Sequence, residues 1–268
     1  MKAILLTSTH RRHQAVANYV ATRCDLVGVW QETKTFVAEH YAGSDDDRDV
    51  IQRHFDARDA SEAKYFADDA ALRLDPGAVV RRVHGNGCND TVEVAEMVAL
   101  EPDVVLVFGT GILRQKLLTP FVGRIINLHL GLSPYYRGAG TNFWPLVNRE
   151  PEYVGATIHY LDAGIDTGPI IAHARPAIDR GDGPHDLGNK TIVAAARLLV
   201  DAARAHLDGR VTAAPQHGGG RFYQRKDFSA AAVRRLYGNL ETGMIEEYLT
   251  DRARRDAAVG LVELNLPV

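Results

Sequence analysis

The sequence lacks the features that define several classes of protein. Only two cysteines, Cys24 and Cys88, occur among 268 residues, too few for a disulfide framework and not spaced as paired metal ligands. The formal net charge of −3 provides no basic excess for binding nucleic-acid phosphates. No apolar run reaches the roughly 18 to 20 residues that a membrane-spanning helix needs. We therefore expect a cytoplasmic protein with structural thiols, no metal ion, and neither a nucleic-acid nor a membrane partner.

Glycine is missing where one class of cofactor would require it. The first apolar run, residues 3–7, is followed by a polar segment without glycine, residues 8–13. Dinucleotide-binding domains carry a glycine-rich turn at this point, so its absence counts against an NAD or FAD enzyme. The same apolar run has no small-residue cleavage site after it, which favours a first strand over a signal peptide.

The sequence does contain apolar runs that alternate with helical patterns. The runs expected to form strands are residues 3–7, 25–31, 78–83, 104–108 and 124–128. Such alternation requires right-handed crossovers and therefore predicts an α/β fold with a Rossmann-like, mainly parallel sheet. A later strand at residues 169–174 and a long helix at 186–207 complete the pattern.

The domain organisation follows from length and from changes in composition. We expect a catalytic domain over residues 1–215, with a charged helical insertion at about 43–75, and a helix-rich C-terminal extension over 216–268. Asp45 to Asp47 fit a solvated helix start better than a metal site. The three glycines at 218–220 predict a flexible link. The apolar positions of the extension could pack on the chain's own core or on a second copy in a homodimer.

The segment 127–138 is the first to suggest chemistry. Asn127 and His129 are two residues apart at the end of an apolar run, so in a strand they share one face. The carboxyl end of a parallel sheet is where open α/β folds hold their ligands. We therefore expect the amide and the imidazole to converge on one small volume there.

A second segment, residues 159–171, surrounds two carboxylates with glycines and a proline. This composition predicts a defined loop that can lay backbone groups against a flat ligand. The loop can also present an aspartate to His129, and a carboxylate beside an imidazole orients the ring and favours its charged form.

Together the two segments carry a resemblance. The pattern N-x-H at Asn127, a proline a few residues later, and D-x-G-x-D-x-G-P from Asp162 resemble the formyltransferases that use 10-formyltetrahydrofolate. The likeness is closest over residues 104–174. It implies a catalytic trio of Asn127, His129 and Asp166, with His159 in support. It also implies pterin contacts, largely through the backbone, from Phe108, Gly109, Thr110, Gly111, Ile112, Leu113, Leu161, Asp162, Ala163, Gly164 and Ile165.

The trio suits the reaction that the resemblance implies. When an acceptor amine attacks a formyl carbon, Asn127 and a charged His129 can donate to the developing oxyanion. Asp166 can pass the amine proton towards the leaving nitrogen, so neither a metal ion nor a covalent intermediate is needed. Acceptor contacts are expected from Ser8, Thr9, Arg12, Tyr135 and Arg137, although residues 10–13 fit a solvated helix start equally well. Tyr136 and Trp144 are expected to form pocket wall or core.

Departures from the family narrow the acceptor. The glycine-rich phosphate loop of the glycinamide ribonucleotide enzyme is missing, and fewer than 50 residues follow Gly220, too few for a tRNA-binding barrel. A nucleotide-linked amino sugar or an amino-acid-like amine remains. Gly131 and Ser133 also depart from the usual order after the histidine. The alternatives are a 10-formyltetrahydrofolate hydrolase, whose relatives carry a regulatory domain ahead of this core, and a non-catalytic folate- or nucleotide-binding module.

Overall fold

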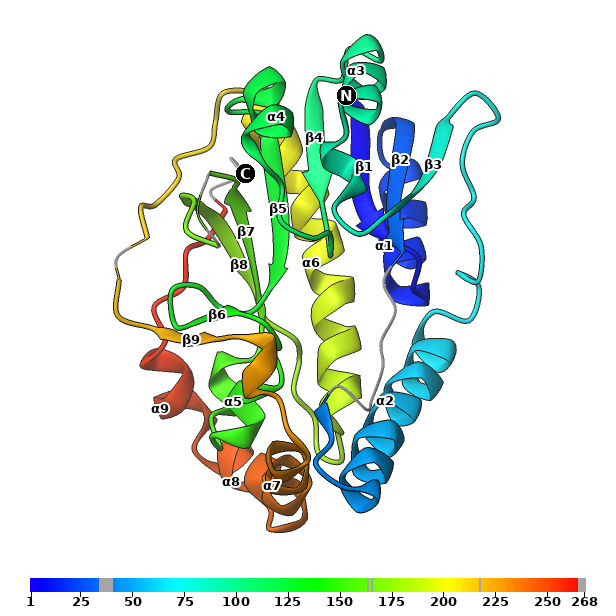
Figure 1. Ribbon diagram of the computed structural model, residues 1–268. Helices are drawn as coiled ribbons and strands as arrows, with labels where there is room; N and C mark the ends of the chain where they lie inside the picture. Colours follow the sequence, from blue (N-terminus) through cyan, green and yellow to red (C-terminus); the bar gives the residue numbers. More distant parts are fainter. Residues whose placement is uncertain (34–40, 163, 165, 217, 265–268) are drawn as a thin grey trace.

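The fold is built on one seven-stranded sheet, seen in a computed structural model that describes residues 1–33, 41–162, 164, 166–216 and 218–264 (Figure 1). The strand order is β3-β2-β1-β4-β5-β7-β8. The strands are β1 Lys2–Ser8, β2 Asp25–Thr33, β3 Val79–His84, β4 Val104–Val107, β5 Ile125–Leu130, β7 Ala156–Tyr160 and β8 Ile170–Ala174. Neighbouring strands from β3 to β5 are parallel, whereas β7 is antiparallel to both of its neighbours, β5 and β8. The predicted α/β, mainly parallel sheet is confirmed.

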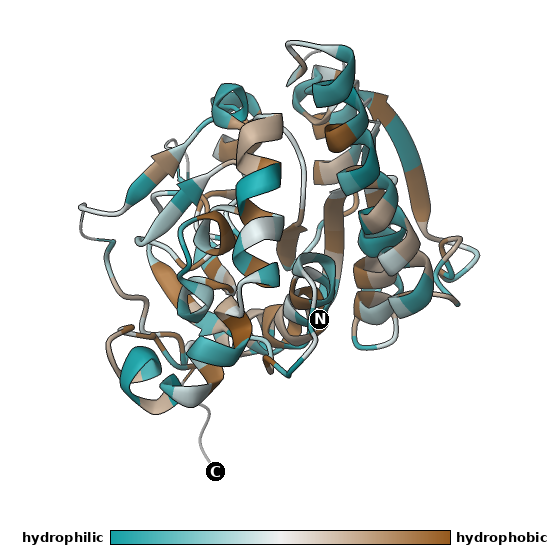
Figure 2. Cartoon of the chain, turned by 90° about the horizontal axis from the view of Figure 1, so that it is seen from below, coloured by the Kyte–Doolittle hydropathy of each residue, from teal (hydrophilic) through white to brown (hydrophobic). Residues whose placement is uncertain are grey.

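Helices cover both faces of the sheet, which explains why its central strands are continuous apolar runs. On one face, α1 and α6 bury Val16 and Leu199 against Leu5 and Leu106. On the other, α3 packs with Ile4, Leu6 and Val105. The helices are α1 Arg11–Ala21, α2 Asp45–Tyr65, α3 Thr91–Ala99, α4 Gln115–Leu118, α5 Trp144–Val147, α6 Pro184–Leu207, α7 Ala230–Glu241, α8 Met244–Thr250 and α9 Arg252–Ala257. In Figure 2 the outer helices alternate between hydrophilic and hydrophobic residues along their length.

The charged segment after residue 43 forms the long helix α2. Its N-terminus is capped by the Ser44 side chain, which accepts from the Asp47 backbone N–H, and its first turn holds three aspartates. These carboxylates favour the helix start because they face the positive end of the helix dipole. Two of them, Asp46 and Asp47, also pair with Arg234 of α7. The helix is therefore tied to the C-terminal part of the chain.

The C-terminal segment packs on the chain's own core. Leu236 of α7 and Ile245 and Tyr248 of α8 are buried in one cluster with Tyr136 and Leu146. The strand β9, Arg221–Tyr223, pairs in parallel with β6, Tyr136–Gly138, to form a second sheet. At Gly138 (φ +92°) an added Cβ would lie 2.1 Å from the Tyr223 carbonyl oxygen, so only glycine allows this approach. No helix among the described residues is long and apolar enough to cross a membrane.

A buried histidine lies where α2 meets α6 and α7. The His54 ring is 4.7 Å from that of His185, and its Nδ1 is 3.2 Å from the Tyr237 hydroxyl. Burial, followed by the nearby His185 and Arg58, lowers the pKa of His54 to about 3. The folded protein therefore holds this ring neutral under conditions in which an unfolded chain would protonate it.

This depressed pKa makes stability depend on pH. The histidine has a pKa of about 6.5 in the unfolded chain. Between that pH and the lower pKa of the folded protein, each fall of one pH unit lowers the free energy of unfolding by about 1.4 kcal/mol. When the pH falls from 7 to 5, the free energy of unfolding of His54→Gln should therefore decrease by about 2 kcal/mol less than that of the wild type. Urea unfolding measures both. The exposed His84→Gln should keep the wild-type dependence. Equal losses in all three proteins would contradict this role.

Candidate active site

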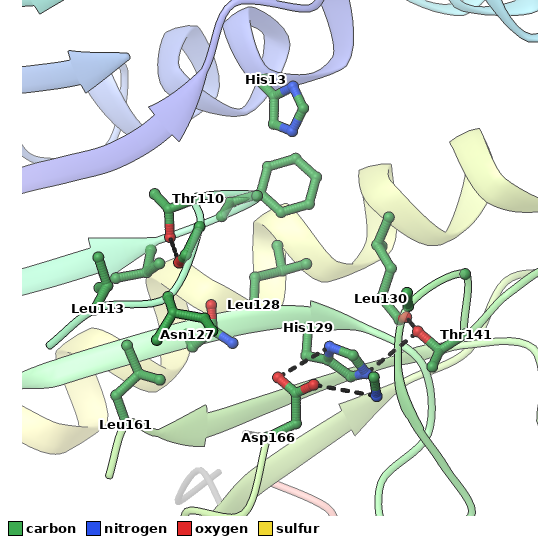
Figure 3. Close-up of a pocket in the computed structure, with 18 of the residues that line it drawn as sticks. His13, Thr110, Leu113, Asn127, Leu128, His129, Leu130, Thr141, Leu161 and Asp166 are labelled. Carbon is green, nitrogen blue, oxygen red and sulfur yellow. Dashed lines mark hydrogen bonds and ion pairs between the residues drawn. The ribbon is translucent and has the colours of Figure 1, made fainter. Parts of the chain in front are cut away.

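A cavity of about 790 Å³ opens at the carboxyl ends of β1, β4 and β5. We call it the main cavity. Its walls are the end of β5, the start of α1, and the loops that follow β4, β6 and β7 (Figure 3). Adjacent parallel strands leave a crevice at this edge because their connecting loops run to opposite faces of the sheet.

The structure brings Asn127, His129 and Asp166 together in this cavity. Asn127 and His129 lie on the same face of β5, and each is 9% exposed. Asp166 comes from the loop between β7 and β8, and its Oδ1 lies 3.3 Å from His129 Nδ1. Its Oδ2 accepts a 3.3 Å hydrogen bond from the Gly138 N–H. Asp166 has a φ of +51°, so the loop holds this residue in the left-handed region to aim its carboxylate.

His159 positions Asn127. The Asn127 Nδ2 is 2.9 Å from His159 Nε2, and His159 Nδ1 is 2.8 Å from the Tyr160 carbonyl oxygen. The carbonyl can only accept, so Nδ1 carries the proton and Nε2 accepts from the asparagine. Burial, followed by the neighbouring His129, lowers the pKa of His159 and favours this neutral ring. One Asn127 N–H is thereby fixed, and the other remains for a ligand in the cavity.

Thr141 is a site residue that the sequence patterns did not reveal. Its hydroxyl donates to the Leu130 carbonyl and lies 3.3 Å from His129 Nε2. Figure 3 shows His129 between Asp166 and Thr141. Both ring nitrogens of His129 therefore face a side-chain oxygen atom. Thr141 lies in a turn without periodic pattern, 12 residues after His129, so no sequence signal marked it.

The unusual glycine after the strand accounts for this contact. Gly131 has a φ of +150°, and a Cβ there would lie 2.5 Å from Thr141 Cβ and 2.8 Å from His129 Nε2. A larger residue would displace Thr141 from the imidazole. The departure from the usual family order at this position therefore fits the local geometry of this chain.

Comparison with known proteins decides the family. The sequence model of the family described as formyl transferase matches residues 48–203, more than half of the chain. The chain belongs to the formyl transferase family. A methionyl-tRNA formyltransferase of Thermodesulfovibrio yellowstonii is 33% identical over 126 residues, which are 47% of this chain and 41% of the relative. The chain thus matches about half or less of the length of such relatives.

Solved structures share the fold of this chain. Glycinamide ribonucleotide transformylase 1 of Symbiobacterium toebii has a TM-score of 0.54 and 20% identity, covering 81% of this chain and 95% of that one. An N-formyltransferase of Helicobacter canadensis, solved with folinic acid and dTDP-3-aminofucose, has a TM-score of 0.53 and 17% identity, covering 85% and 72%. At these identities the likeness concerns the fold alone.

The two segments expected to hold the pterin both border the main cavity. The first, residues 108–113, lines it throughout, and Leu161, Asp162 and Gly164 of the second also do so. Ala163 and Ile165 lie outside the described residues. The fully buried Glu32 accepts from the Gly111 N–H and holds the first segment from behind. Glu32 was not predicted, although a carboxylate at the end of an apolar strand is a signal for such a role.

Of the five residues expected to contact the acceptor, all of which the structure describes, only Arg12 lines the main cavity. Its guanidinium, however, pairs with the buried Glu62 carboxylate. The Ser8 hydroxyl donates to the Glu32 carbonyl oxygen at 2.8 Å, and the Tyr135 hydroxyl bonds to Gly260. Neither these two nor Thr9 and Arg137 are among the described residues that line the cavity. Trp144 is buried and stacks on Tyr223 with ring centres 4.2 Å apart.

The loop that carries Asp166 depends on a glycine two residues later. A Cβ at Gly168 would lie 1.8 Å from the Tyr160 carbonyl oxygen. Gly168→Ala should therefore lower the unfolding free energy by about 2 kcal/mol, through overpacking. Gly188 lies inside α6 with nothing within 4 Å of an added Cβ. Gly188→Ala should instead raise stability by about 0.5–1 kcal/mol. Urea unfolding tests both, and equal effects would contradict the proposed constraint.

Proposed function

We propose that this formyl transferase moves a formyl group from 10-formyltetrahydrofolate to the amine of a small-molecule acceptor. The observation that supports it best is the convergence of Asn127, His129 and Asp166 in one cavity. The reaction requires attack of an amine nitrogen on the formyl carbon, stabilisation of the resulting oxyanion, and transfer of a proton from the attacking to the leaving nitrogen. Each requirement can be matched to a residue of the trio.

Asn127 supplies the hydrogen-bond donor for the oxyanion, and His129 lies beside it. The Asn127 amide keeps one N–H for the cavity because His159 takes the other. A charged His129 adds positive charge on the same strand face. Both side chains are nine-tenths buried and already oriented, so they need little reorganisation as negative charge develops. Removing one such donor typically costs about 3 to 4 kcal/mol of transition-state stabilisation.

Asp166 transfers the proton from the attacking to the leaving nitrogen. Its carboxylate is held between His129 Nδ1 and the Gly138 N–H and borders the same cavity. It can accept the proton of the attacking amine, directly or through a water molecule, and return it to the leaving nitrogen. The contact with His129 holds the carboxylate at the edge of the cavity.

The walls of the main cavity fit a folate donor. The cavity volume of about 790 Å³ lies within the usual range for small-molecule sites. Residues 108–113 and the described part of 161–166 border it from two sides, and Ile112 presents a side chain that is 61% exposed. A flat pterin bound there would cover that apolar surface. The folinic acid in the Helicobacter canadensis neighbour supports the same class of donor.

The acceptor is proposed to be a small amine. The sugar-nucleotide acceptor of the Helicobacter canadensis neighbour belongs to this class. The net charge of −3 argues against a polyanionic tRNA, even though the curated relatives include methionyl-tRNA formyltransferases. The segment that matches the family model, residues 48–203, contains the trio.

The proton relay can be tested at its carboxylate. Asp166→Asn preserves the shape of the side chain but removes the proton acceptor, so kcat should fall at least about 100-fold with little change in the thermal midpoint. The exposed Asp49→Asn on α2 serves as the matched control. Steady-state kinetics with 10-formyltetrahydrofolate and an active amine give both values. Undiminished turnover in Asp166→Asn would refute the relay.

The role of His159 can be separated from a general structural one. His159→Phe preserves a buried ring but cannot accept from Asn127, so kcat should fall about 10- to 100-fold while KM changes little. Because His159 acts through Asn127, the double variant with Asn127→Ala should be no slower than Asn127→Ala alone. Multiplicative losses in the double variant would show that His159 acts elsewhere.

A further inference from the structure

A second, smaller cavity adjoins the main one. Its volume is about 300 Å³, and it shares wall residues with the main cavity. The shared residues are His10, Ala139, Gly140, Phe143 and Arg225. A single ligand could therefore extend from the trio past Gly140 into this space, which we call the aromatic cavity.

The aromatic cavity is lined by side chains from three distant segments. Its Phe, Tyr and Trp residues are Tyr41, Phe55, Phe143, Trp144 and Phe228, five of eleven lining residues in a chain that is only 7% aromatic. The Phe228 ring lies 5.2 Å from that of Phe143 and 5.6 Å from that of Phe55. These positions come from the start of α5 and the residue before it, from α2 and the segment before it, and from the segment before α7. Helix α2 and the C-terminal segment thus build this wall together.

Charge is nearly absent from the walls of this cavity. His54 contributes a neutral ring, since its pKa is lowered to about 3 by burial. Arg225 carries the only full charge among the described lining residues, and it takes part in no ion pair with another described residue. It stands at the boundary shared with the main cavity. The remaining surface offers ring faces and edges.

We propose that the aromatic cavity binds a flat, uncharged ring at the far end of the acceptor amine, while the amine itself lies at the trio. This inference rests on the proposed transfer to a small amine and adds the class of that amine. Ring faces and edges stabilise a flat π-system more than a saturated ring of similar size. Arg225 lies where an acidic group joining the ring to the amine would pass. A nucleobase or a simple aryl group would meet the same requirement.

The test measures binding directly, so it does not depend on turnover. The probes are thymidine 5′-monophosphate, 2-phenylethylamine and its saturated counterpart 2-cyclohexylethylamine, titrated by calorimetry with and without tetrahydrofolate. Phe55→Leu and Phe228→Leu keep apolar volume but remove the flat ring. Phe222, 45% exposed and outside the described lining of the aromatic cavity, provides the matched control Phe222→Leu. Circular dichroism and thermal midpoints verify that each variant is folded.

The proposal predicts that at least one flat-ring probe binds and that both cavity variants weaken it about fivefold or more. Phe222→Leu should bind as the wild type does, and the cyclohexyl compound should bind more weakly than its aryl counterpart. Binding of the nucleotide alone would identify a nucleobase, and binding of the arylamine alone a simple aryl group. Both results support the proposal.

Three results would overturn it: no binding of either flat-ring probe, unchanged affinity in both cavity variants, or an arylamine that binds no more tightly than a saturated counterpart that also binds. Failure of the proposed function would look different. In that case flat-ring probes would still bind in a manner sensitive to Phe55 and Phe228, but no amine would become formylated.

Discussion

The contact between His129 Nδ1 and Asp166 Oδ1 is the interaction around which the site is organised. It joins the end of the last parallel strand to a loop between two antiparallel ones. The register of β5 and β7 places Asn127 opposite His159, and Gly168 allows the loop to close against Tyr160. In this antiparallel pair the carboxyl end of β7 lies beside Ile126 near the start of β5, and the loop that follows it brings Asp166 to His129.

Much of this arrangement could be predicted from short-range patterns. The apolar runs predicted the parallel strands, since burial on both faces leaves little room for polar residues. The spacing of Asn127 and His129 predicted a shared face because the strand period is two residues. The long helix α6 followed from apolar spacing over 186–207. These features depend on residues that are close in sequence, so a local pattern of residue types is enough to predict them.

The remaining features depend on contacts between distant segments. The β6–β9 pairing joins residues about 85 positions apart, and Glu32 supports a loop near Gly111. Thr141 reaches His129 only because Gly131 leaves space. The aromatic cavity combines α2 with residues 224–228. Contacts between such distant residues produce no periodic pattern in the sequence. They place α2 and the C-terminal segment beside the cavity that holds Asn127, His129 and Asp166.

The central claim is folate-dependent transfer to an amine. The most direct test follows tetrahydrofolate released from 10-formyltetrahydrofolate, with and without pooled primary amines, while mass spectrometry detects the formylated product. The account predicts that tetrahydrofolate is released only when an amine is present, together with an equal amount of the N-formylated amine. Release of tetrahydrofolate and formate without any amine would contradict transfer and indicate hydrolysis. Neither release nor folate binding under either condition would contradict the assignment of the main cavity to a folate donor.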